Sequence, residues 1–73
     1  METKVLDTRG LKCPMPALKM LSESRNMAKG DILEVVADCA TFEADVRKWC
    51  DQTKRVLLWM KAEGTAKRCS VRI

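Results

Sequence analysis

Four segments of the chain have the hydrophobic pattern of β-strands. Residues 3–8 form a short apolar segment with polar neighbours, and 32–37 is β-branched and apolar apart from Glu34. Residues 56–62 are apolar at consecutive positions from Val56 to Met60, whereas 66–73 alternates between apolar and polar side chains. One set of alternate positions in this last segment is predicted to face a core: Cys69, Val71 and Ile73.

Another segment, from Pro14 to about Met27, has a helical period. Its apolar side chains recur at steps of three and four residues and predict a stripe that faces the core, at Met15, Leu18 and Leu21, with Ala28 as a further candidate. The following Lys29-Gly30-Asp31 predicts the end of this helix, because glycine commonly follows a last helical turn.

A second helical segment is predicted to begin near Asp38 or Thr41, and either side chain could cap its first turn. Its apolar residues lie at positions i, i+4, i+7 and i+8 of one face, at Phe42, Val46, Trp49 and Cys50. This stripe predicts that Cys50 is a core residue rather than a reactive thiol, and the alternation of the last strand predicts the same for Cys69.

The order of these elements, β-α-β-α-β-β, predicts an α/β (α+β) two-layer sandwich. Two helices would pack on one face of a four-stranded mixed sheet, and residues 1–73 would form a single domain. The loops that follow segments 3–8 and 32–37 would then lie at one edge of the sheet. Because segment 56–62 is apolar on both faces, an exposed patch of Leu57 and Trp59 is a candidate contact surface.

Composition and charge narrow the class of protein. The chain is 47% hydrophobic and 33% charged, which is typical of a folded domain, and no apolar run is long enough to cross a membrane. The N-terminus lacks the pattern of an export signal, so we expect a cytoplasmic protein without a disulfide framework. The net charge of +4 is compatible with an acidic protein partner or RNA but requires neither.

The content of cysteine and histidine restricts the chemistry further. The chain has four cysteines, no Cys-x-x-Cys pair and no histidine. A zinc site would need all four thiolates at unusual spacing, so we expect no metal, and a Cys-His pair is excluded. A reactive cysteine must therefore be activated by a helix end, by nearby cations or by a partner.

The run from Asp7 to Pro16 places a cysteine where a helix is predicted to begin. Gly10 can turn the chain after the first strand. Pro14 suits the first helical position, so Cys13 is the predicted N-cap residue, while Pro16 falls within the first turn, where its missing N–H breaks no helical bond.

This position favours the thiolate of Cys13, because free N–H groups and the positive end of the helix dipole stabilise an anion. Arg9 and Lys12 add positive charge nearby, and Met15 could line the surroundings of the thiol. A cysteine with the ordinary pKa of about 8.5 is about 3% thiolate at pH 7, whereas a pKa of about 6.5 gives about 75%. The alternative is a small apolar residue that packs under the helix start.

The run of residues 6–16, LDTRGLKCPMP, resembles the signature of the TusA/SirA/YedF family of small sulfur-carrier proteins. The strand, the Arg-Gly-Leu turn and the Cys-Pro-x-Pro helix start occur in the same order. Residues 37–41 resemble the family's second strand-to-helix junction, except that Cys39 stands where the family more often has proline or another non-thiol residue. The resemblance implies a fold similar to the C-terminal domain of bacterial translation initiation factor 3. It also implies that Cys13 carries sulfur as a persulfide, within a supporting motif of Arg9, Gly10, Lys12, Pro14 and Pro16.

The leading hypothesis is therefore a sulfurtransferase that acts as a stoichiometric sulfur carrier. Cys13 would accept sulfane sulfur from a donor protein of the cysteine desulfurase or rhodanese type and relay it to an acceptor protein. We expect no cofactor, because the sulfur is held only as a transient persulfide on Cys13. The resemblance does not distinguish tRNA thiolation, cofactor sulfuration and other sulfur metabolism.

Two alternatives belong to other classes. Cys39 also lies at a predicted helix start on the same sheet edge, so it could be a second reactive thiol that pairs with Cys13 in a redox switch. An RNA-binding module would instead use residues of the open sheet face: Trp59, Arg68 and Arg72.

Overall fold

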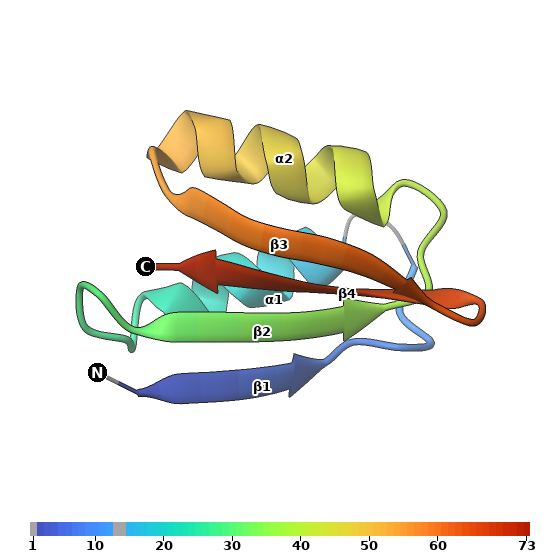
Figure 1. Cartoon of the computed structure of the whole chain (residues 1–73), viewed down its shortest axis with the longest axis horizontal. Coiled ribbons are helices and arrows are strands. Elements are labelled where there is room, and N and C mark those ends of the chain that lie inside the picture. Colours follow the sequence, from blue (N-terminus) through green and yellow to red (C-terminus); the bar gives the residue numbers. More distant parts are fainter. Residues whose placement is uncertain (1, 13–14) are drawn as a thin grey trace.

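The computed structural model describes residues 2–12 and 15–73. Its elements are β1 (Thr3–Asp7), α1 (Met15–Ser24), β2 (Ile32–Ala37), α2 (Phe42–Thr53), β3 (Val56–Glu63) and β4 (Ala66–Arg72). The strands lie in the order β1-β2-β4-β3, and Figure 1 shows them side by side with α1 behind the sheet. The β1–β2 pair is parallel and the other two pairs are antiparallel, so the predicted mixed sheet is confirmed.

The two helices cover one face of this sheet and enclose the core. The core contains residues of β2, β4 and both helices: Met20, Leu33, Val35, Ala37, Phe42, Val46, Trp49, Cys50, Cys69 and Val71. The predicted stripe on α2 is therefore confirmed, as are the core positions of Cys50 and Cys69. Burial raises the pKa of Cys69 to about 12 and also raises that of Cys50, so both thiols are poor nucleophiles at neutral pH. In the described ranges, no helix has the length and apolar character needed to cross a membrane.

Helix α1 turns a different face to the core than the sequence pattern predicts. Met20 is fully buried and Pro16 and Ser24 are buried on the same row, whereas Leu18 is 52% exposed and Met15 is 40% exposed. The predicted stripe is therefore wrong. The buried row contains a proline, and its serine hydroxyl donates to a backbone carbonyl of the same helix at 2.8 Å, so neither residue looks apolar in the pattern.

The end of α1 also differs from the prediction, because the helix stops at Ser24 rather than near Met27. The amides of Asn26 and Met27 still donate to carbonyls three residues earlier, at 3.0 and 3.2 Å, which continues the chain as turns. Gly30 does not end the helix. It adopts a positive φ of 97° in the turn before β2, and its amide donates to the carbonyl of Ile73.

A β-bulge changes the alternation of side chains along β3. Leu57 pairs with Val71 and Trp59 pairs with Ser70, so Leu58 is an extra residue on β3. Leu57 consequently packs against the core, and the prediction that it forms an exposed patch with Trp59 is wrong. The large apolar side chains of β3 that are exposed are Val56, Leu58 and Trp59.

Candidate functional site at the carboxyl ends of β1 and β2

The loops that follow the parallel strands β1 and β2 lie at one edge of the sheet, as predicted, and the turn between β3 and β4 lies at the same end (Figure 1). Thr8, just beyond β1, is only 1% exposed. Its amide and its hydroxyl both donate to the carbonyl of Val36 at 2.8 Å. These two bonds attach the start of the first loop to β2.

A second contact joins the two loops themselves. The amide of Gly10 donates to Oδ1 of Asp38 at 3.0 Å, and the two residues are 28 positions apart in the chain. Gly10 has a φ of +87°, and no atom lies within 4 Å of the place where a Cβ would stand. A glycine is thus required by the backbone conformation, which other residues rarely adopt, and not by lack of space.

Arg9 holds the same loop to the end of β1. Its Nε and Nη2 donate to the two carboxylate oxygens of Asp7 at 3.0 and 2.8 Å, and its amide donates to Oδ1 at 3.0 Å. The side-chain bonds from Arg9, followed by the amide bond, lower the pKa of Asp7 to about 2. Lys12 forms no ion pair with any residue the structure describes. Its charge is therefore more available to an anion nearby than that of Arg9.

Cys13 and Pro14, the centre of the predicted site, lie outside the described residues. The N-cap position of Cys13 and the first helical position of Pro14 therefore stay predictions. The residues on either side are described: the amide of Met15 donates to the carbonyl of Lys12 at 2.8 Å. Pro16 is the second residue of α1 and lies in its first turn, as predicted.

The second junction contains Cys39, which is partly buried and packs against the core. Its Sγ lies 3.6 Å from Oγ1 of Thr41, and the Thr41 hydroxyl lies 2.9 Å from Oδ2 of Asp45, to which it donates. Thr41 occupies the N-cap position of α2 without a capping bond from its side chain. The prediction that Asp38 or Thr41 caps α2 through its side chain is therefore wrong, since Asp38 instead accepts from the first loop.

The open face of the sheet bears the residues of the RNA-binding hypothesis. The guanidinium of Arg68 donates to Glu63 and Glu34, each at 2.7 Å, and both carboxylates raise its pKa. Nζ of Lys61 lies 4.8 Å from the centre of the Trp59 ring. Because Arg68 is already engaged by two carboxylates, its charge is largely compensated on this face.

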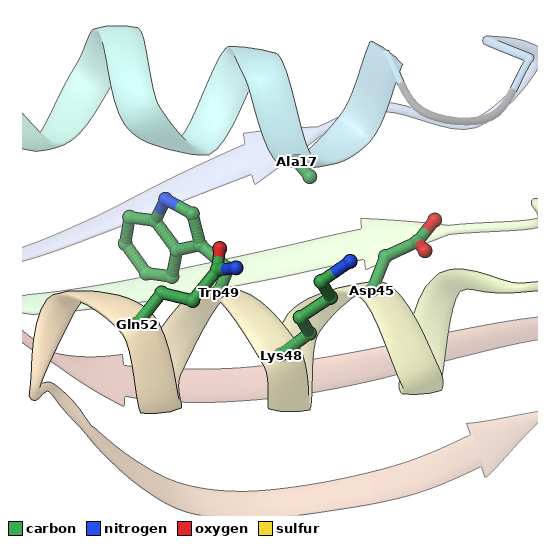
Figure 2. A pocket seen from close by; sticks show the side chains of 5 residues that line it. All are labelled: Ala17, Asp45, Lys48, Trp49 and Gln52. Atoms are coloured by element: carbon green, nitrogen blue, oxygen red, sulfur yellow. The ribbon is translucent and has the colours of Figure 1, made fainter.

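Sequence reasoning missed a pocket of about 230 Å³ between the two helices. Figure 2 shows its lining residues: Ala17, Asp45, Lys48, Trp49 and Gln52. The pattern of apolar residues indicates which face of a helix is buried but not how far two helices stand apart, so no sequence signal could locate it. The pocket is smaller than the roughly 300–1,000 Å³ of typical small-molecule sites, so it favours no small-molecule substrate.

Comparison with known proteins covers nearly the whole chain. A family model described as Sulfurtransferase TusA matches residues 4–73. The Sulfur carrier protein TusA of Pseudomonas putida (strain W619) is 34% identical over 60 residues, which is 82% of this chain and 75% of that protein. Relatives from Aquifex aeolicus and Bacillus subtilis, whose names also include "sulfur carrier protein", are 34% and 37% identical over 62 residues. Those residues are 85% of this chain, and the chain spans about a third of the length of these two relatives, at 32% and 34%.

Proposed function

Because the chain belongs to the TusA family of sulfurtransferases, we propose that it is a sulfur carrier whose Cys13 holds a sulfane sulfur as a persulfide. The family match over residues 4–73 carries the proposal, since it includes the Cys-Pro-Met-Pro run at 13–16. The relatives named as sulfur carriers support the same role.

The transfer consists of two displacements in which no atom is oxidised or reduced overall. In the first, the Cys13 thiolate attacks the outer sulfur of a donor persulfide; a new S–S bond forms, the donor S–S bond breaks, and the donor cysteine leaves as a thiolate. In the second, an acceptor thiolate attacks the outer sulfur held by Cys13. The acceptor becomes the persulfide, and Cys13 returns to the thiolate.

The surroundings of Cys13 support this role in three ways. The bonds of Thr8, Arg9 and Gly10 hold the preceding loop against the sheet, which would limit the positions open to the thiol. The charge of Lys12, which pairs with no described residue, would favour both a thiolate and an anionic persulfide at the neighbouring Cys13. The small size of the helix pocket favours protein partners, because an exposed persulfide can be passed between proteins without an enclosed substrate site.

The partners in this proposal are a donor protein of the cysteine desulfurase or rhodanese type and an acceptor protein with a thiolate. The carrier works without a resident cofactor, because sulfur itself is the cargo. A reducing compartment such as the cytoplasm suits it, since thiols must stay available there.

Intact mass under non-reducing conditions tests the proposal. After incubation with a sulfane-sulfur donor we expect a gain of about 32 Da, one sulfur atom, in the wild-type protein and in Cys39→Ser but not in Cys13→Ser. Equal sulfur uptake by Cys13→Ser would contradict the proposal. A loss of about 2 Da that needs both cysteines would instead support the redox switch.

A further inference from the structure

We propose that Asp38 is a positioning residue for the loop that presents Cys13, and that it acts through its hydrogen bond to Gly10 rather than through its charge. The inference rests on the proposed function, because it concerns the efficiency with which Cys13 accepts sulfur. It concerns a residue of the second loop, which lies 25 positions beyond Cys13 in the sequence.

The position of the Asp38–Gly10 bond in the site supports this role. Thr8 is joined to β2 by two bonds to one carbonyl, but these bonds lie at the strand end. Gly10 is two residues closer to Cys13, and the 3.0 Å bond from its amide is the outermost hydrogen bond between the two loops within the described residues. Removal of this bond would take away one attachment of the loop beyond Thr8 to the second junction.

The conformation of Gly10 makes that bond consequential. Glycine has access to more backbone conformations than any other residue, and its φ of +87° here is only one of them. The amide of Leu11 donates to the Thr8 carbonyl at 3.2 Å, a local bond that does not reach the second loop. The bond to Asp38 therefore holds the Gly10 amide in one orientation, two residues before Lys12.

The charge of Asp38 would have the opposite effect on a thiolate. A carboxylate near Cys13 disfavours an anionic sulfur, because like charges repel. The carboxylate is close to the first loop, since Asp38 contributes, after the larger effect of Asp7, to the raised pKa of Arg9. If Asp38 acts through its hydrogen bond, its loss should slow sulfur uptake; if it acts through its charge, its loss should speed uptake. Variants of Asp38 can therefore separate the two roles.

Three variants make the separation. Asp38→Ala removes both the acceptor and the charge, whereas Asp38→Asn keeps an Oδ1 acceptor and removes only the charge. Asp51→Ala is the matched control. Asp51 is an exposed carboxylate on α2 whose side chain forms no hydrogen bond or ion pair in the described part of the chain.

The first measurement is the rate of sulfur uptake at Cys13 from inorganic polysulfide, together with the pH dependence of Cys13 alkylation, each followed by peptide mass. We expect Asp38→Ala to slow uptake about three- to tenfold and to move the alkylation midpoint to higher pH, because the loop before the thiol loses its hydrogen bond to the second junction. Asp38→Asn and Asp51→Ala should stay within about twofold of wild type. Faster uptake and a lower midpoint in both Asp38 variants would overturn the inference in favour of a charge effect.

Hydrogen exchange at the Gly10 amide gives a second measurement that does not depend on sulfur. Exchange should accelerate in Asp38→Ala and stay near the wild-type rate in Asp38→Asn. Uptake by Asp38→Ala at the wild-type rate would overturn the inference while the proposed function stands. A wild-type protein that takes up no sulfur at Cys13 would overturn the proposed function and the inference together, whatever the exchange rates.

Discussion

The two faces of the sheet are built from the same four strands, yet different forces stabilise them. On the face covered by the helices, Leu33 and Val35 have no exposed surface. On the open face, Val5 is 58% exposed and Trp59 is 37% exposed, and ion pairs of Arg68 cross the strands. An apolar side chain stabilises the fold in proportion to the area removed from water, so equal side chains on the two faces contribute unequally. The covered face therefore stabilises the fold mainly through apolar burial, whereas exposed apolar side chains of the open face contribute less.

Truncation of one apolar residue on each face should give the largest contrast. Leu33→Ala leaves a cavity under the helices and should lower the free energy of unfolding by about 2–5 kcal/mol. Val5→Ala on the open face should change it by less than about 0.5 kcal/mol. Urea denaturation of both variants measures the difference, and similar losses would show that the open face is covered in solution.

Alkaline pH should lower the stability of the fold through ionisation of Cys69, a buried thiol of the covered face. The folded pKa of Cys69 is raised from 9.0 to about 12, so its contribution to stability is complete below pH 9 and is lost as pH rises toward 12. The reason is that the unfolded chain ionises this thiol while the folded chain keeps it neutral. Between pH 8 and 11, the free energy of unfolding measured with urea should therefore decline less steeply in Cys69→Ala than in wild type. Parallel declines of the two proteins would contradict the prediction.

Loss of the ion pairs on the open face should have a smaller effect. Arg68 joins Glu34 and Glu63, but its side chain is 27% exposed, so solvent screens these pairs. We expect Arg68→Ala to cost about 0.5–1 kcal/mol of unfolding free energy at low salt and less at high salt. Arg25→Ala serves as the control, because Arg25 is exposed and forms no ion pair among the described residues. A loss for Arg68→Ala as large as that of Leu33→Ala would remove the distinction between the faces.

Acid should produce the smallest effect, at the end of β1. The pKa of Asp7 is lowered from 3.8 to about 2, chiefly by the side-chain bonds of Arg9, so its stabilising effect is present above pH 3.8 and disappears as pH falls through 2. From pH 5 to pH 2, the free energy of unfolding should fall less steeply in Asp7→Asn than in wild type. Because Asp7 is exposed, we expect only a slight difference, and a steeper fall in the variant would contradict the assignment.

The parts of the fold with a regular apolar pattern could be predicted from the sequence. The bounds of β2 follow from a β-branched apolar run with one polar residue, and the buried stripe of α2 follows from the regular helical spacing of its apolar residues. The buried row of α1 could not be predicted, because Pro16 and Ser24 do not look apolar and the exposed Leu18 does. The bulge at Leu58 was also hidden, since consecutive apolar residues leave the alternation undefined.

The candidate site, like the fold, has features that the sequence could predict and features that it could not. The edge at which the two loops meet follows from the order of the elements. The bond from Gly10 to Asp38 could not be predicted, because it joins residues 28 positions apart and depends on the tertiary arrangement. The pairing of Arg9 with Asp7 is local, but the sequence alone could not show whether Arg9 would turn toward Asp7 or toward the thiol.

The extra residue on β3 also affects how the protein behaves among its neighbours in a crowded solution. β3 is an outer strand of the sheet and exposes three large apolar side chains, which is the usual profile of a strand that recruits another chain. The bulge at Leu58 offsets the outward row of N–H and C=O groups, so a second chain cannot pair in register along all eight residues. An irregularity that accompanies the packing of Leu57 against the core thereby also disfavours pairing of β3 with another chain along its full length.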